Sequence, residues 1–334
     1  MSDFLTRLEQ FLSSRNEDLQ IEQLTPDAST REYFRVAWRG STAIVCIYPE
    51  PFIESDQSYL DVTGLFLAAG LPVAHILDFD ESLGALAIED FGDSILRETL
   101  NSAESARREE LIDRAIELIP RIQAATDLAF ERNSIASRLK FDKEKLSWEL
   151  DFFKEHYFTT LKRRPLDSET DAAVTKEFVE LSRELESRAA VLCHRDFHAA
   201  NLMLDQNGEL KIIDHQDARI GAASYDLVSL LLDRVTEPPS AEWLAEKRRW
   251  FLAGREALGL EKIDENEFAY EFRLQTIQRG LKAAGTFSFQ SANRGKTYFL
   301  PFIKPMFQIV LRAAENLKRF PALKAILRAE LERT

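Results

Sequence analysis

The sequence predicts a two-lobed α+β fold, with a small β-rich lobe followed by a large helical lobe. Strand-like segments rich in β-branched and aromatic residues crowd the first part of the chain. Long segments with helical periodicity fill the remainder. The length of 334 residues, with 45% hydrophobic and 30% charged residues, is typical of a globular protein large enough for two lobes.

The N-terminal part combines an amphipathic helix with several strands. The helix pattern occupies residues 1–12. The expected strands are 19–24, 32–38, 42–48, 73–79 and 84–90. Gly40 and Ser41 separate the second strand from the third and predict a hairpin. A helix is expected from about Ile53 to Ala69, because Gly70 and Pro72 form a stop signal.

Helical patterns dominate after residue 93, and a short strand and a hairpin interrupt them. The helical stretches are 103–125, 142–161, 169–188 and 241 to the end. The strand is 190–193, and the hairpin joins 201–205 to 209–214. We therefore expect a β-rich N-lobe at 1–88, a short connecting segment at 89–93 and a helical C-lobe at 94–334. A cleft between two such lobes is a usual place for a ligand.

Composition narrows the classes of function. A net charge of −13 argues against nucleic-acid binding, which needs a basic surface. Cys46 and Cys193 lie in apolar runs and predict buried free thiols in a reducing compartment. No window approaches the ~20 apolar residues of a membrane span, and the N-terminus lacks the features of a signal peptide. We expect a cytoplasmic protein without membrane association, and no obligate protein partner is evident.

The segment 191–214 contains the side chains that most clearly indicate a particular reaction. Phosphoryl transfer from ATP needs a carboxylate that orients the attacking hydroxyl and accepts its proton. It also needs oxygen ligands that hold Mg²⁺ between the phosphates. Asp196 fits the first role, whereas Asn201 and Asp214 fit the second and lie beside short predicted strands. For a lone Asp, a role in a turn is the alternative.

The order His194-Arg195-Asp196, Asn201, Asp214 and Tyr225-Asp226-Leu227 resembles protein kinases and, more closely, the aminoglycoside phosphotransferase family. The resemblance implies a protein-kinase-like fold with ATP and Mg²⁺ as cofactors. It also implies that the N-lobe at 1–88 binds the nucleotide, that 89–93 is the hinge, and that the C-lobe at 94–334 holds the catalytic loop and the sugar site. It implies that His194 is structural and that Asp226 braces the catalytic loop, although a helix N-cap is its ordinary role. His198 stands where protein kinases have a Lys and could contact the γ-phosphate or substrate; a solvated loop histidine is the alternative.

The sequence contains neither a G-x-G-x-x-G nor a Walker A pattern, the usual glycine-rich signatures of phosphate binding. In the segment TPDASTREYFRV, Ser29 and Thr30 could turn donors toward phosphates, although a polar hairpin loop is the alternative. The third predicted strand has no Lys, so Arg31 or Arg35 replaces it or Mg²⁺ carries more of the phosphate charge.

One further segment and one further residue bear on nucleotide binding. Ile88-Glu89-Asp90-Phe91-Gly92 resembles the family's hinge, which implies that backbone groups near Glu89 and Phe91 bind adenine. Asp61 occupies the place of the acid that partners the kinase Lys. Because that Lys is absent, the role of Asp61 is open.

The segments DASTREYFR, IQRGLKAAGTFSF and RGKTYF, with the motif above, resemble bacterial anomeric kinases of N-acetylmuramate and N-acetylglucosamine. That resemblance implies formation of a sugar 1-phosphate in cell-wall sugar recycling. Arg279 and Lys282 lie on neighbouring helix faces and could bind the lactyl carboxylate, and Arg294 and Lys296 are further candidates. A solvated basic face is the alternative. Asp217 could bind sugar hydroxyls or form a turn.

Two other functions remain open. A kinase for another small hydroxyl compound, such as an amino sugar, aminoglycoside or amino alcohol, would suit the acidic net charge. A catalytically inactive kinase-like binding protein would suit the missing third-strand Lys. The intact set of Asp196, Asn201 and Asp214 argues against the second of these.

Overall fold

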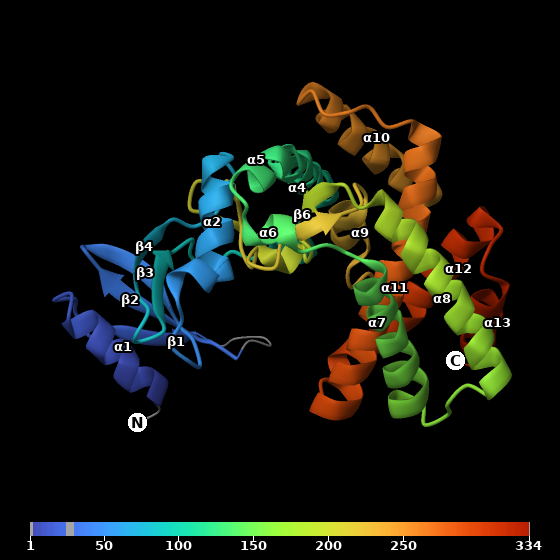
Figure 1. Ribbon diagram of the computed structural model, residues 1–334, viewed down its shortest axis with the longest axis horizontal. Coiled ribbons are helices and arrows are strands. Elements are labelled where there is room, and N and C mark those ends of the chain that lie inside the picture. The colour runs from blue at the N-terminus through green and yellow to red at the C-terminus, as the bar shows by residue number, and fades with distance from the viewer. Residues whose placement is uncertain (1–2, 25–29, 334) are drawn as a thin grey trace. The chain divides into compact units, whose positions relative to one another are not determined.

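The computed structural model describes residues 3–24 and 30–333 (Figure 1). Contacts divide the chain into two compact units. Unit 1 comprises residues 1–103, 128–136 and 199–217, and unit 2 comprises 104–127, 137–198 and 218–334. The predicted fold class is confirmed, since an antiparallel sheet dominates the N-terminal part and helices dominate the C-terminal part. The lobe and hinge boundaries expected from the sequence stay a prediction.

A five-stranded sheet in the order β1-β2-β3-β5-β4 forms the centre of unit 1, and every neighbouring pair is antiparallel. Its strands are β1 (Ile21–Leu24), β2 (Glu32–Trp38), β3 (Ser41–Ile47), β4 (Ile76–Asp80) and β5 (Ala85–Glu89). Alternate residues of β2, namely Phe34, Val36 and Trp38, are buried, as the period of a strand requires. The predicted N-terminal helix is α1 (Asp3–Ser13), whose buried Leu8 and Phe11 complete this core.

The hairpin between β2 and β3 turns at Arg39 and Gly40, which have φ values of 47° and 83°. Trp38 pairs with Ser41, so the predicted turn at Gly40 and Ser41 is wrong by one residue. A two-residue turn with positive φ at both positions matches the twist of the flanking strands. Gly40 adopts this conformation without steric cost.

Helix α2 (Ser58–Ala68) confirms the predicted helix of unit 1 but starts later than expected. Residues Glu54–Asp56 form a separate 3₁₀ turn, η1. The side chain of Gln57 accepts a hydrogen bond from the backbone N–H of Tyr59 and caps the helix. The predicted stop is confirmed, since Gly70 has a φ of 68° just beyond the helix.

The remainder of unit 1 positions the segment that follows the predicted catalytic loop. Strands β7 (Leu202–Leu204) and β8 (Leu210–Ile212) form the expected hairpin. The backbone N–H of Ile212 donates to Pro72, which ties this hairpin to the segment before β4. The shorter elements are η3 (Ala199–Asn201) and α3 (Leu96–Ser102), and unit 1 also includes most of α5 (Thr126–Glu131) and half of α6 (Ile135–Arg138).

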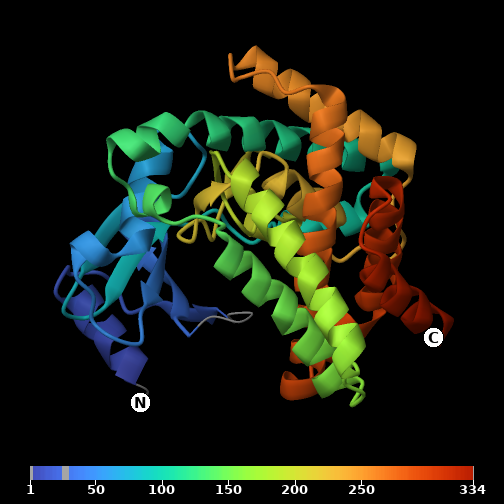
Figure 2. The same ribbon diagram turned by 45° about the vertical axis from the view of Figure 1, so that its right-hand side comes forward.

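Unit 2 is built around the long helix α11, against which α7 and α8 pack (Figures 1 and 2). Its main elements are α4 (Ser105–Ala124), α7 (Lys143–Phe153), η2 (Lys154–Leu161), α8 (Ser168–Arg188), α9 (Tyr225–Leu232), α10 (Ala241–Ala257), α11 (Glu265–Arg294), η4 (Thr297–Phe302), α12 (Ile303–Leu317) and α13 (Pro321–Glu332). Strand β6 (Val191–Cys193) pairs with β9 (Arg219–Gly221). The buried Leu274, Ile277 and Leu281 place one face of α11 in the core.

The two cysteines, Cys46 and Cys193, are free and buried, as predicted.

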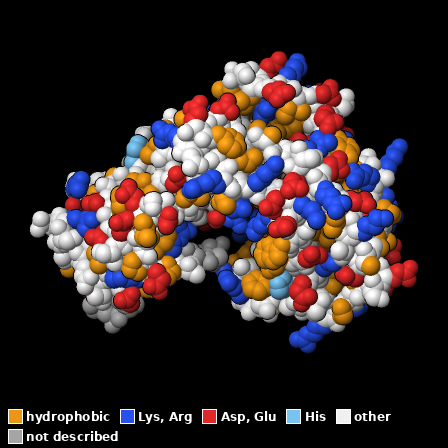
Figure 3. Space-filling model, viewed as in Figure 1, with side chains coloured by type: hydrophobic (Ala, Val, Ile, Leu, Met, Phe, Trp, Pro, Cys, Tyr) orange, Lys and Arg blue, Asp and Glu red, His pale blue; other side chains and the backbone are white. Residues whose placement is uncertain are grey.

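The helices and the surface give two further observations. Across residues 3–24 and 30–333, no helix combines the length and the apolar character needed to cross a membrane. On the face drawn in Figure 3, acidic and basic side chains are interspersed.

Candidate active site

The loop that carries Asp196 leaves β6 and is held by the carboxylate of Asp226. The backbone N–H groups of His194 and Arg195 donate to the two oxygens of Asp226 at 2.7 and 3.1 Å. Asp226 is completely buried in the first turn of α9. Arg195 has a φ of 85°, a conformation that non-glycine residues rarely adopt and that surrounding contacts must maintain. The carboxylate of Asp226 therefore fixes the backbone on which Asp196 lies.

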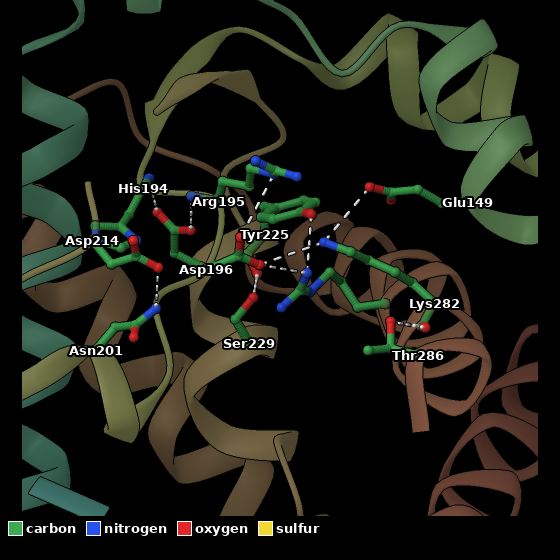
Figure 4. A network of polar contacts seen from close by, with 12 residues as sticks. Glu149, His194, Arg195, Asp196, Asn201, Asp214, Tyr225, Ser229, Lys282 and Thr286 are labelled. Carbon is green, nitrogen blue, oxygen red and sulfur yellow. Dashed lines mark hydrogen bonds and ion pairs between the residues drawn. The ribbon is translucent and has the colours of Figure 1, made fainter. Parts of the chain in front are cut away.

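The carboxylate of Asp196 lies among cations of unit 2 (Figure 4). One oxygen is 3.4 Å from the ammonium of Lys282 and 3.5 Å from the guanidinium of Arg279, and the other is 3.6 Å from Arg195. Burial alone would raise the pKa of Asp196, but the charges of Lys282, Arg279 and Arg195 hold it well below its usual range. The side chain is 31% exposed, so an ionised carboxylate remains accessible to a ligand.

Arg279 is fixed by an aromatic stack. Its guanidinium lies 4.9 Å from the ring centre of Tyr225 and donates to the Tyr225 hydroxyl at 3.2 Å. Tyr225 in turn stacks on Phe141, with ring centres 4.0 Å apart and planes inclined by 22°. Arginine suits this role because its planar guanidinium can stack and donate at the same time. These contacts give the cation beside Asp196 a defined position.

Asn201 and Asp214 lie together in unit 1. The Asn201 amide donates to one oxygen of Asp214 at 3.3 Å, and the Gln216 amide donates to the other at 2.9 Å. Asp214 follows β8 with a φ of 61°, and the next residue, His215, is buried and hydrogen-bonded to Thr63 of α2 at 2.7 Å. These contacts hold the carboxylate at the end of the β7–β8 hairpin.

The donor set of Asn201 and Asp214 fits Mg²⁺. Mg²⁺ prefers oxygen ligands and usually takes only one or two carboxylates together with waters and substrate phosphates. In the described part of the chain, no group of three or more His, Cys, Asp or Glu residues could hold a metal ion by itself. Asn201 and Asp214 would supply part of the coordination of Mg²⁺, and waters and phosphate oxygens would supply the rest.

Of the two arginines proposed to replace the missing Lys, only one lies beside Asp214. The guanidinium of Arg31 is 3.9 Å from the Asp214 carboxylate and donates to the Tyr48 hydroxyl at 3.4 Å. Arg35 instead pairs with Asp90 at 2.8 Å and Asp93 at 2.6 Å. Arg31 is therefore the one of these two arginines that lies near the Asn201–Asp214 pair.

Four other residues were expected to contact the nucleotide, namely Ser29, Thr30, Glu89 and Phe91. Ser29 lies outside the described residues, and Thr30 is exposed. Glu89 ends β5, and its backbone N–H already donates to His75 at 3.0 Å. Phe91 is buried, with the ammonium of Lys211 above its ring.

Asp61, whose role the sequence left open, accepts hydrogen bonds from the hydroxyl of Ser134 and the backbone N–H of Ile135. These bonds cap the start of α6. Asp61 therefore contributes to the structure of unit 1 through backbone and hydroxyl donors.

The residues expected to bind the acceptor sugar do not all lie together. Arg279 and Lys282 meet at Asp196, whereas Arg294 lies about 18 Å further along α11 at ~1.5 Å per residue and covers the ring of Phe289. Lys296 follows the end of that helix. Asp217 is half-buried in unit 1.

Two histidines of the Asp196 loop have different surroundings. His194 is fully buried with its ring edge-on to Phe197, at 5.6 Å between ring centres. His198 is half-buried, and its backbone N–H donates to the carbonyl of Asp196 at 2.9 Å, which tightens the turn.

Comparison with known proteins assigns the family. Residues 20–260 match the phosphotransferase enzyme family (APH), which is more than half of the chain. The chain belongs to this family. The matched segment of this phosphotransferase contains Asp196, Asn201, Asp214 and Asp226 but ends before α11 begins. The cations of α11 therefore lie outside the part that defines the family.

Two curated relatives of this phosphotransferase carry the same name. The N-acetylmuramate/N-acetylglucosamine kinase of Neisseria meningitidis serogroup B is 28% identical over 313 residues, which cover 93% of this chain and 90% of the relative. The N-acetylmuramate/N-acetylglucosamine kinase of Caulobacter vibrioides is 28% identical and covers 74% and 79%.

Among solved structures, choline kinase from Streptococcus pneumoniae aligns with a TM-score of 0.57 at 14% identity, over 92% of this chain and 99% of that chain. The likeness at this identity concerns the fold. It supports the kinase-like architecture predicted for the phosphotransferase.

One residue of the Asp196 cluster was not predicted from the sequence. Glu149 of α7 is 3.6 Å from the ammonium of Lys282, although it lies far from Lys282 along the chain. A signal was present, because Glu149 is a charged residue in the same helical stripe as the buried Leu146 and Phe153. An acid on an apolar helix face indicates a buried polar partner.

Proposed function

We propose that this phosphotransferase uses Mg-ATP to phosphorylate the anomeric hydroxyl of N-acetylmuramate or N-acetylglucosamine, giving the sugar 1-phosphate. The observation that carries the proposal is the similarity to a kinase of these two sugars over 93% of the chain. The resemblance of IQRGLKAAGTFSF in α11 to anomeric kinases supports the same acceptor.

Asp196 is proposed to orient the acceptor hydroxyl. Kinases depend mainly on positioning and electrostatic stabilisation, since the transition state of phosphoryl transfer is loose. An anomeric hydroxyl is more acidic than an ordinary alcohol, so a weakly basic, ionised carboxylate suffices to accept its hydrogen bond and later its proton. The lowered pKa of Asp196 keeps it in that ionised form at neutral pH.

Asn201 and Asp214 are proposed to hold Mg²⁺, which when bound neutralises charge on the phosphate oxygens. Arg31 adds a positive charge beside Asp214 and is proposed to contact the same phosphates. For Ser29, Thr30, Glu89 and Phe91, contact with the nucleotide stays a prediction.

The charges around Asp196 favour a neutral or anionic acceptor over a cationic one. Lys282, Arg279 and Arg195 all lie within 3.6 Å of its carboxylate. An aminoglycoside or an amino alcohol would bring a further positive charge to this cluster, and like charges at short distance repel. The lactyl carboxylate of N-acetylmuramate would instead find two cations, with Arg279 able to offer paired donors. His198 and Asp217 stay candidates for contacts with the acceptor.

A panel of acceptors tests this proposal. With Mg-ATP, we expect N-acetylmuramate or N-acetylglucosamine to give a kcat/KM at least ~10-fold above that of choline, ethanolamine or an aminoglycoside, because ~1.4 kcal/mol of charge repulsion gives that ratio. A coupled assay for ADP release measures it. The Asp196→Asn protein, purified in the same way, excludes a contaminating kinase. Turnover confined to the cationic acceptors would contradict the proposal.

A further inference from the structure

A buried acid lies next to the cations of the Asp196 cluster. Glu149 of α7 is only 2% exposed. One of its oxygens is 3.6 Å from the ammonium of Lys282, and the other accepts a hydrogen bond from the Gln278 amide at 2.7 Å. The oxygen of that amide accepts from Gln275 at 3.0 Å. A buried carboxylate is costly unless it is paired and hydrogen-bonded, and here it is both.

The backbones of α7 and α11 fix the position of Glu149 relative to Lys282. A Cβ atom at Gly285 would lie 2.8 Å from the Cα atom of Phe153, a distance that real Cβ atoms essentially never show. The two helices therefore approach closely at this point, which glycine permits. Phe153 is one turn beyond Glu149, and Gly285 is one turn beyond Lys282. The acid and the lysine thus face each other one turn away from a tight helix contact.

Lys282 consequently lies between two carboxylates, at 3.6 Å from Glu149 and 3.4 Å from Asp196 (Figure 4). A lysine ammonium is a compact charge on a flexible stem, so its position depends on its partners. Glu149 belongs to a rigid helix, whereas Asp196 belongs to a loop. We infer that Glu149 is a positioning residue, which holds Lys282 at a set place against Asp196 and thereby fixes the orientation of that carboxylate.

This inference rests on the proposed function, in which Asp196 orients the acceptor hydroxyl. It differs from an ion pair that only stabilises the fold. Lys247 of α10 also lies between two carboxylates, at 2.7 Å from Glu109 and 2.6 Å from Asp113. The Lys247 triad only connects α10 to α4. In the Glu149–Lys282 pair, the lysine also contacts Asp196, the residue proposed to orient the acceptor.

The charges that face Lys282 determine how its pKa responds. Burial lowers the pKa of Lys282, and the carboxylates of Asp196 and Glu149 oppose that effect. Arg279 of the same helix and Arg195 of the loop lower it further. Removing the charge of Glu149 removes one of the two groups that favour the ammonium, so the pKa of Lys282 should fall further. Activity that needs the ammonium should then disappear at a lower alkaline pH.

A double-mutant cycle with N-acetylglucosamine and Mg-ATP tests the inference. We expect Glu149→Gln to lower kcat by about tenfold, a size typical of coupling between neighbouring charges, with the KM for ATP changed less than ~2-fold. In the Lys282→Met background the same change should have no further effect. The alkaline limb of the pH profile of kcat should move to lower pH in Glu149→Gln and be absent in Lys282→Met. Equal effects of Glu149→Gln in both backgrounds, or an unmoved alkaline limb, would overturn the inference.

A matched control separates positioning from stability. Glu330 is also a buried acid of unit 2, 3% exposed, and it accepts a hydrogen bond from Tyr157 at 2.9 Å and pairs with Arg164. Glu330→Gln should lower the thermal unfolding temperature without moving the alkaline limb. All variants are assayed at a temperature at which circular dichroism shows them folded.

A titration that needs no turnover distinguishes the inference from the proposed function. The Lys282 side-chain signal in NMR should titrate at lower pH in Glu149→Gln than in the unsubstituted protein. If that shift is observed while no sugar is phosphorylated, the proposed function fails and the Glu149–Lys282 coupling stands. If sugars are phosphorylated but the shift is absent, the inference fails and the proposed function stands.

Discussion

Replacing Asp196 with Asn should lower kcat by ~10²–10⁴-fold, the usual contribution of a positioned acid or base. Asn has the same shape but carries no charge, so it orients a hydroxyl poorly and accepts no proton. The carboxylate contacts Lys282 and Arg279, both of which keep other partners, Glu149 and Tyr225 respectively. The loop backbone is held by Asp226 and should not move. Steady-state kinetics with the accepted sugar measures the loss.

Nucleotide binding gives the control for this prediction. Asp196 is assigned to the acceptor hydroxyl, whereas Asn201, Asp214 and Arg31 are assigned to Mg²⁺ and the phosphates of the nucleotide. Calorimetric titration of the Asp196→Asn protein with Mg-ADP should therefore give a Kd within ~3-fold of that of the unsubstituted protein, less than ~1 kcal/mol. Retention of more than a tenth of the original kcat would refute the role assigned to Asp196.

Replacing Asp226 with Asn should damage both folding and turnover. Each oxygen of the fully buried carboxylate accepts one backbone N–H, from His194 and from Arg195. An amide keeps one acceptor and turns its NH₂ group toward the other N–H. The unsatisfied buried donor should cost ~1–3 kcal/mol of unfolding free energy. Because the same bonds hold Arg195 at its positive φ, kcat should fall as well.

Asp264 provides a matched control for Asp226. It also accepts two backbone N–H groups, from Asn266 and Glu267, but both bonds go to the same oxygen at the exposed start of α11. Asn caps a helix about as well as Asp, so Asp264→Asn should change stability by less than ~0.5 kcal/mol. Urea unfolding measures both variants. Equal stability of Asp226→Asn and Asp264→Asn would contradict the bracing role of Asp226.

The sequence predicted the elements whose signal is local. All five strands of the sheet appear near the expected residues because their alternation and β-branched content are contained within each segment. The pairing of β6 with β9 was missed, since β9 has only three residues and depends on a partner distant in the chain. The helix expected at 142–161 continues as a π-helix from Lys154, a change that sequence periodicity does not reveal.

The same distinction applies to the candidate site. Asp196, Asn201 and Asp214 belong to one motif, so their spacing identified them as a set. Lys282 and Arg279 were expected to face a substrate carboxylate, and in the described structure they contact Asp196. Glu149 could not be paired with Lys282 in advance, because the pairing depends on how closely α7 approaches α11.

The position of the new phosphate tests the central claim most directly. Incubation with Mg-ATP and N-acetylglucosamine or N-acetylmuramate, followed by proton–phosphorus correlation NMR, identifies the phosphorylated hydroxyl. We predict a phosphorus signal coupled to the anomeric proton, which the Asp196→Asn protein should form at least ~100-fold more slowly. A product phosphorylated at another hydroxyl, or release of inorganic phosphate alone, would contradict anomeric transfer directed by Asp196.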